Sequence, residues 1–139
     1  MFEVWWEITE EMNMKRILTI FLLLFSINGY CEWTKVNDSV DFTSYMDKTT
    51  IKRNGNTVKI WQLLDYKTPQ ELKSGKYKSS VILFEYDCKE EQRRILSLVE
   101  YEDQMGIGKP ILTIDEYDKW AYVKPNTHDF IMMKFLCNK

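Results

Sequence analysis

The chain has 139 residues, of which 45% are hydrophobic and 29% charged, and its formal net charge is −2 at pH 7. This length suits one domain with a modest core, and the near-neutral charge provides no overall field that would favour nucleic acid. The chain has one histidine and three cysteines without paired-cysteine spacing, so the sequence predicts no metal site and no cofactor.

A short apolar run, residues 17–27, follows Lys15 and Arg16 and precedes the small residues Gly29 and Cys31. A cationic start, an apolar middle and small residues at the end are the layout of a secretory signal peptide. The run is much shorter than the roughly 20 residues that span a bilayer. We therefore expect a cleaved signal and export beyond the inner membrane, to the periplasm, the medium or the outer-membrane surface.

Residues 1–13 are acidic and contain no Lys or Arg, which suggests that the natural start is Met14. Residues 1–31 are then leader and signal peptide, with cleavage near Cys31, and residues 32–139 form a single domain. Two alternatives remain open: residues 1–13 are a genuine extension, or Cys31 is lipidated, although bulky Tyr30 stands where a lipidation signal has a small residue. Removing the leader takes away two basic and four acidic residues, which leaves a formal net charge of zero.

The first half of the domain predicts antiparallel strands. Asp41–Asp47 alternates in polarity, and Thr49–Arg53 and Thr57–Tyr66 flank Asn54-Gly55, a strong signal for a two-residue hairpin. Pro69 and Gly75 interrupt the next segment, so we expect residues 67–75 to form a loop.

Tyr77–Cys88 is the longest predicted strand, and Arg93–Tyr101 is its expected antiparallel neighbour across a turn at residues 89–92. The side chains of the longer strand should alternate between two faces. The first face comprises Ser80, Ile82, Phe84, Tyr86 and Cys88, and the second comprises Ser79, Val81, Leu83, Glu85 and Asp87. After a loop at residues 105–110, short strands are expected at Ile111–Ile114 and Lys119–Val123.

The period changes after Pro125. Asn126 or Thr127 is a suitable N-cap, and Phe130, Met133 and Cys137 recur at helical spacing. In an oxidising compartment, the pair Cys88 and Cys137 predicts one disulfide, which would attach this helix to the end of the long strand. The predicted fold is α+β: an antiparallel sheet of about six strands with a C-terminal helix tethered by a disulfide.

A set of short segments occurs in a fixed order along the domain: Trp33-Thr34-Lys35-Val36, Tyr45-Met46-Asp47, Ile51 to Asn56, Val58 to Trp61 with Asp65-Tyr66, Tyr77 to Ser80, Glu85 to Lys89, Arg93-Arg94, Trp120, Pro125 and Cys137. In this order they resemble the surface-adhesin protein E family. The resemblance covers nearly all of residues 32–137, and a Tyr-Asp-Cys-Lys segment with one terminal cysteine is its most specific part.

The resemblance implies a six-stranded antiparallel sheet with a disulfide-held C-terminal helix, in agreement with the pattern above. It also implies a surface-exposed binding protein of Gram-negative bacteria, for which a homodimer is one possible state. The implied partners are host extracellular matrix or serum proteins of the vitronectin and laminin kind.

Positive charge is concentrated in the first half of the domain. The candidate ligand-binding residues are Lys52, Arg53, Lys59, Lys76 and Lys78, which could form a basic surface for an anionic glycan or an acidic protein. The alternative is that these cations are only the solvated faces of strands and loops. Trp33, Trp61 and Trp120 are expected mostly in the core, and any exposed one would be a suitable interface anchor.

No catalytic residues are predicted. His128 lies near the expected helix start and is more typical of a solvated or capping residue than of a base, and the two cysteines are used in the disulfide. Glu85, Asp87, Glu100 and Glu102 could approach one another on adjacent strands, although strand surfaces often carry such groups. The sequence therefore favours an exported, non-enzymatic binding protein of the adhesin type, with a small periplasmic enzyme or enzyme inhibitor as the alternative.

Overall fold

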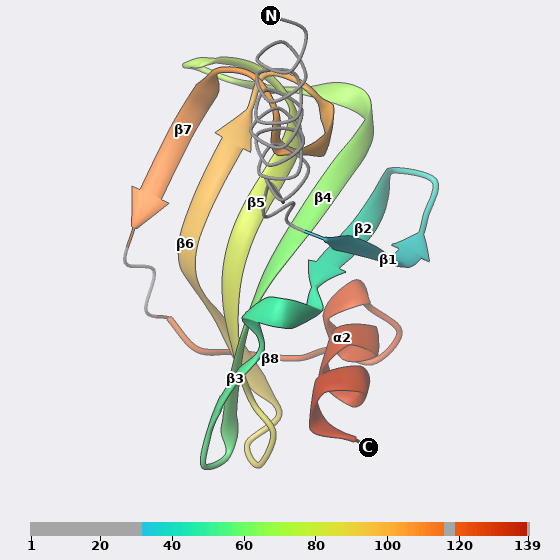
Figure 1. The fold of residues 1–139 in the computed structure, drawn as a ribbon, viewed down its shortest axis with the longest axis vertical. Coiled ribbons are helices and arrows are strands. Elements are labelled where there is room, and N and C mark those ends of the chain that lie inside the picture. The colour runs from blue at the N-terminus through green and yellow to red at the C-terminus, as the bar shows by residue number, and fades with distance from the viewer. Residues whose placement is uncertain (1–31, 116–118, 139) are drawn as a thin grey trace, which may run out of the picture. The chain divides into compact units, whose positions relative to one another are not determined.

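The computed structural model describes residues 32–115 and 119–138, so the predicted leader and signal peptide lie outside the described residues. One continuous antiparallel sheet forms the body of this unit (Figure 1). The strands are β1 (Trp33–Asp38), β2 (Phe42–Asp47), β3 (Lys52–Asn54), β4 (Thr57–Leu72), β5 (Gly75–Asp87), β6 (Gln92–Tyr101), β7 (Pro110–Asp115) and β8 (Ala121–Tyr122); the helices are η1 (Lys48–Thr50), η2 (Gln104–Gly106) and α2 (His128–Cys137).

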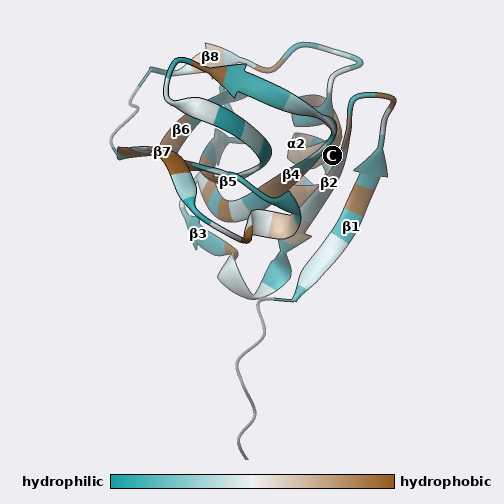
Figure 2. Cartoon of the chain, turned by 90° about the horizontal axis from the view of Figure 1, so that it is seen from above, coloured by the Kyte–Doolittle hydropathy of each residue, from teal (hydrophilic) through white to brown (hydrophobic). Residues whose placement is uncertain are grey.

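The main path of the sheet has the order β1-β2-β4-β5-β6-β7, while β3 pairs with β4 and β8 pairs with β6. This arrangement confirms the predicted α+β fold with about six main strands and one C-terminal helix. Hydrophobic and hydrophilic residues alternate along the strands of the curved sheet (Figure 2). Such alternation gives a sheet two faces of different character.

One face of the sheet packs against α2. Ile82, Phe84 and Tyr86 of β5 lie in the core with Met132 and Leu136 of the helix. Of the two faces expected for this strand, the one with Ile82, Phe84 and Tyr86 is the face that meets the helix. The helical face was only partly predicted, because Met132 and Leu136 are fully buried, whereas Phe130 and Cys137 lie at the edge of the core.

The N-terminus of α2 is capped locally, and its C-terminal end is fixed to the sheet. Thr127 is the N-cap, and its side chain accepts a hydrogen bond from the backbone N–H of Phe130 at 3.3 Å. At the other end, the predicted disulfide joins Cys88 and Cys137, whose Cα atoms are 5.6 Å apart. Arg53 also donates a hydrogen bond from Nη1 to the carbonyl oxygen of Leu136 at 2.6 Å.

Three predictions about the strands were wrong in detail. Thr49 and Thr50, expected at the start of a strand, lie in the short helix η1, and β3 begins only at Lys52. The β3–β4 hairpin is present, but Asn54 pairs with Thr57, so Gly55 and Asn56 are the two turn residues. Gly55 adopts the positive φ that this position of a tight turn requires. The expected loop at residues 67–75 is instead the continuation of β4 and the start of β5, which pair up to Leu72 and Gly75.

Pro69 is tolerated in this long strand for a structural reason. The β4–β5 register is irregular between Asp65 and Gln70, and the pairing of β2 with β4 ends at Tyr66. Proline lacks a backbone N–H and is confined to edges and irregularities of a sheet. The first strand, β1, was not predicted at all; it is an edge strand with a register shift between Lys35 and Asn37.

Within the described part of the chain, no helix is long and apolar enough to cross a membrane.

Candidate functional site

The face of the sheet opposite α2 is only partly covered. The segment around η2 packs against Leu63 and Val81, and a Cβ added to Gly106 would lie 2.9 Å from Val81 Cγ2. Ser79 fixes this segment, because its hydroxyl donates to the carbonyl of Asp103 at 2.6 Å and accepts from the N–H of Gly106 at 2.9 Å.

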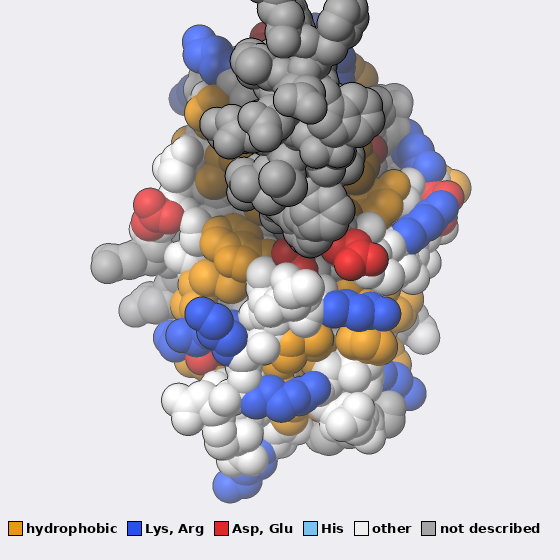
Figure 3. Space-filling view, in the orientation of Figure 1, with side chains coloured by type: hydrophobic (Ala, Val, Ile, Leu, Met, Phe, Trp, Pro, Cys, Tyr) orange, Lys and Arg blue, Asp and Glu red, His pale blue; other side chains and the backbone are white. Residues whose placement is uncertain are grey.

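Two residues along β4 from Leu63, this face opens into a cavity of about 420 Å³. We call it the Trp61 cleft. Its lining residues come from η1 (Thr49, Thr50), from β3 (Lys52), from β4 (Lys59, Trp61) and from β5 (Leu83). It therefore combines an aromatic and aliphatic lining with two cations and two hydroxyl groups. In the view of Figure 3, Lys and Arg side chains are interspersed with hydrophobic ones toward the β3 end of the sheet.

The sheet register explains how the two lysines meet. Lys52 pairs with Lys59, Lys59 pairs with Glu85, and Glu85 pairs with Arg94, so one row of charges crosses four strands. Residues directly opposite each other on neighbouring strands point to the same face and interact. The row contains three cations and one carboxylate.

The carboxylate of this row is bound by the arginine. Arg94 Nη2 lies 2.7 Å from Glu85 Oε2, and the guanidinium lies 4.6 Å from the ring centroid of Trp120. Among the described residues, neither Lys52 nor Lys59 forms an ion pair. The cleft consequently has an excess of positive charge beside an indole ring.

The backbone near the cleft is already hydrogen-bonded. The N–H of Trp61 donates to Thr50 Oγ1 at 3.1 Å, and that hydroxyl donates to the carbonyl of Asp47 at 2.7 Å. Along the cleft β5 pairs with β4 and β6, whereas β4 pairs with β3 only up to Lys59 and with β2 only from Gln62, so at Trp61 the hydrogen bond to Thr50 replaces a ladder partner on that side. A ligand in the cleft would therefore be recognised by side chains.

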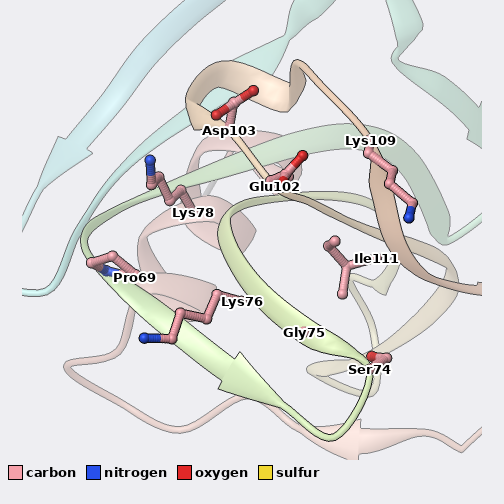
Figure 4. A pocket seen from close by; sticks show the side chains of 9 residues that line it. All are labelled: Pro69, Ser74, Gly75, Lys76, Lys78, Glu102, Asp103, Lys109 and Ile111. Carbon is pink, nitrogen blue, oxygen red and sulfur yellow. The ribbon is translucent and has the colours of Figure 1, made fainter.

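A second cavity, of about 470 Å³, lies at the other end of β5 (Figure 4). It is lined by the candidate ligand-binding residues Lys76 and Lys78 and by Lys109, which was not a candidate. Glu102 and Asp103 also line it, so its charge is mixed, and Lys76 is paired with Glu71 at 3.0 Å. Glu85, the cross-strand partner of Lys59, lies seven residues along β5 from Lys78. At the rise of a β-strand this separates the two cavities by about 23 Å.

The structure thus distributes the five candidate cations over three places. Lys52 and Lys59 share the Trp61 cleft, Lys76 and Lys78 share the second cavity, and Arg53 holds the C-terminal end of α2. Trp61 was expected mostly in the core, and its place in the cleft was not predicted. Its two-residue spacing from Lys59 in a strand, which puts both on one face, is the signal that could have found it.

The four carboxylates that could have acted together are in different settings. Glu85 binds Arg94, and Asp87 Oδ1 accepts the N–H groups of Lys89 and Glu90 in the turn. Glu102 lines the second cavity. Glu100 is buried, and Ser80 Oγ donates to its Oε2; burial raises the pKa of this carboxyl above its ordinary value.

His128 is not a solvated residue. Its Nε2 lies 3.1 Å from Gln62 Oε1, its Nδ1 lies 3.4 Å from Ser44 Oγ, and its ring packs edge-on to Phe42. Gln62 is itself buried and donates to the hydroxyl of Tyr86 at 3.0 Å. Burial lowers the pKa of His128, so this network holds the start of α2 on the sheet with a neutral imidazole.

The described residues contain no group of three or more His, Cys, Asp or Glu side chains that could hold a metal ion.

The geometry defines a class of small disulfide-bonded domain, in which one helix covers one face of an antiparallel sheet and the other face carries side-chain-lined cavities. Residues 33–138 match the family described as Surface-adhesin protein E, and the chain belongs to that family.

Solved structures of Haemophilus influenzae protein E share this fold. One aligns with a TM-score of 0.57 at 12% identity, covering 76% of this chain and 83% of that chain. A second, from the non-typeable organism, aligns with a TM-score of 0.55 at 12% identity, covering 81% of this chain and 79% of that chain. At this identity the likeness establishes the fold alone. No curated protein sequence matches the chain.

Proposed function

We propose that this chain is an exported, non-enzymatic binding protein of the cell surface that attaches to extracellular matrix or serum proteins, or to the anionic glycans associated with them. Membership of the surface-adhesin protein E family over residues 33–138 is the observation that carries this proposal. The family description implies a surface location, and hence export, for which the predicted signal peptide would provide the route.

The described side chains favour binding over catalysis. The carboxylates that could have served as acid and base are separated, and two of them, Glu85 and Asp87, are engaged in an ion pair and in turn hydrogen bonds. His128 is held between Gln62 and Ser44. The cations at the Trp61 cleft remain available for an anionic partner.

A binding screen tests the proposal. The full chain is presented to immobilised vitronectin, immobilised laminin and a panel of sulfated and neutral glycans, at low and physiological ionic strength. We expect saturable binding to at least one of these partners, and weaker binding at higher salt, because exposed charges are screened over about 10 Å at 0.1 M. Absence of saturable binding to every member of the panel would overturn the proposal.

The same samples test whether the chain forms a homodimer, the one oligomeric state that the family resemblance implies as possible. Sedimentation equilibrium over a range of protein concentrations should show a concentration-dependent rise in mass. A constant monomer mass would remove the homodimer from the proposal while leaving ligand binding in place.

A further inference from the structure

The side chains of the Trp61 cleft suit a ring-shaped ligand that has apolar faces and an anionic substituent at its edge. Trp61 and Leu83 provide apolar surface, and Lys52 and Lys59 provide two cations beside it. Its volume of about 420 Å³ lies within the range typical of small-molecule sites, roughly 300–1,000 Å³. Such sites combine apolar and aromatic walls with a few polar groups that orient the ligand.

The arrangement of the two lysines favours an anionic ligand. They are direct cross-strand partners, and like charges placed opposite each other destabilise a sheet. The nearby carboxylate of Glu85 is bound by Arg94 at 2.7 Å, so it does not compensate them. A bound anionic group between the two ammonium groups would relieve this repulsion.

The location of the cleft favours a saccharide over an extended peptide. Peptides that add to a sheet use the free backbone groups of an edge strand. Here the ligand would lie over β4 and β5. Lys59 and Leu83 are paired with neighbouring strands on both sides, and Trp61 is paired with Leu83 on one side while its N–H is bound to Thr50 on the other. Recognition would rely on an aromatic face and two cations, which suit a sugar ring with an acidic substituent. The hydroxyls of Thr49 and Thr50 already donate to Asp47, so toward the sugar they act only as acceptors.

We propose that the Trp61 cleft binds an acidic sugar unit, with a pyranose face on Trp61 and its carboxylate or sulfate between Lys52 and Lys59. This inference rests on the proposed function and assigns it a site. The sugar could belong to a host glycosaminoglycan or to the acidic core of a bacterial lipopolysaccharide, since both present a pyranose ring with an anionic group.

Calorimetric titration of the full chain with defined oligosaccharides tests the site. The probes are a sulfated heparin tetrasaccharide, its desulfated and carboxyl-reduced analogue, an acidic lipopolysaccharide core oligosaccharide and a poly-glutamate peptide. We expect one of the two acidic saccharides to bind, and the saccharide that binds identifies the source. The neutral analogue and the peptide should bind at least tenfold more weakly.

Paired variants locate the binding. The double substitution Lys52→Gln with Lys59→Gln should weaken saccharide binding about tenfold, because each exposed ion pair contributes up to a factor of about five. The matched control, Lys76→Gln with Lys78→Gln, removes the same charge at the far end of β5 and should change binding less than twofold. Trp61→Leu should weaken binding similarly while the circular dichroism spectrum stays unchanged.

Three results would overturn the inference. They are an equal effect of the two lysine pairs, binding that is unaffected in a folded Trp61→Leu protein, and poly-glutamate that binds as tightly as the saccharide. If matrix-protein binding survives in the Lys52 and Lys59 variant and no saccharide binds, the proposed function stands and the assigned site fails. If neither proteins nor saccharides bind, the proposed function itself fails.

Discussion

The Cys88–Cys137 disulfide should account for a large part of the stability of this domain. The two cysteines are 49 positions apart, and the bridge attaches the last turn of α2 to the end of β5. In the chain-entropy model, closing a loop of this size removes about 4 kcal/mol of unfolded-state entropy. Whole domains are stable by only about 5–15 kcal/mol, so the double substitution Cys88→Ser with Cys137→Ser should leave a marginal fold.

Urea unfolding of the full chain, followed by circular dichroism, measures this effect. We expect the free energy of unfolding to fall by about 4 kcal/mol in the double variant, and by a similar amount when the unaltered protein is reduced and alkylated. Alkylation without prior reduction is the matched control, since it leaves the bridge intact and should leave the unfolding midpoint unchanged. A loss below about 1 kcal/mol in samples shown to lack the bridge would refute the reasoning, because the stabilisation expected from loop closure would then be far too large.

The remaining predictions concern the helix contacts and two buried titratable groups, each followed by urea unfolding. Arg53→Ala should cost about 1.5 kcal/mol, because the carbonyl of Leu136 loses a charged donor, while Arg53→Lys should recover part of this. Burial raises the pKa of Glu100 above its ordinary value of 4.5, so the stability that this group contributes is lost as pH rises from that value through the raised pKa. Glu100→Gln, which can still accept from Ser80, should remove this loss. Burial lowers the pKa of His128, so its contribution is present above pH 6.5 and is lost as pH falls below it; His128→Gln should flatten this part of the profile, and an unchanged profile would contradict the assignment.

The elements that could be predicted are those with one buried face and an unambiguous partner. In β5, Ile82, Phe84 and Tyr86 alternate with less buried residues because only one side of the strand meets α2. The second half of β4 was missed because Pro69 is normally a breaker, and only the register irregularity before Gln70 shows why it is tolerated.

The candidate site was less predictable, because it depends on register between strands. Nearness along the chain grouped Lys52 and Arg53 together, but neighbouring residues of a strand point to opposite faces. Lys52 therefore meets Lys59 across the sheet, whereas Arg53 reaches Leu136 on the side of α2. The period of a strand predicts on which face a residue lies. It does not predict which residue lies opposite on the next strand, because that depends on the register.

Among the described residues Lys52 and Lys59 form no ion pair, and a substitution at Lys52 should therefore change the stability of the fold and its affinity for the saccharide in opposite directions. Lys52 lies on exposed β3 and faces Lys59, so Lys52→Glu replaces a repulsive cross-strand pair with an attractive one. Cross-strand pairs contribute roughly 0.2–1 kcal/mol, and we expect the free energy of unfolding to rise by about that amount. The same change removes one of the two cations proposed to hold the anionic group, so affinity for the acidic saccharide should fall.

Lys76→Glu provides the matched comparison for this substitution. Lys76 is paired with Glu71 at 3.0 Å, so the change breaks an ion pair and places two carboxylates opposite each other. It should lower stability slightly and leave saccharide affinity unchanged. If Lys52→Glu destabilised the fold as much as Lys76→Glu does, Lys52 would already have a stabilising partner. Its charge would then not be available for a ligand.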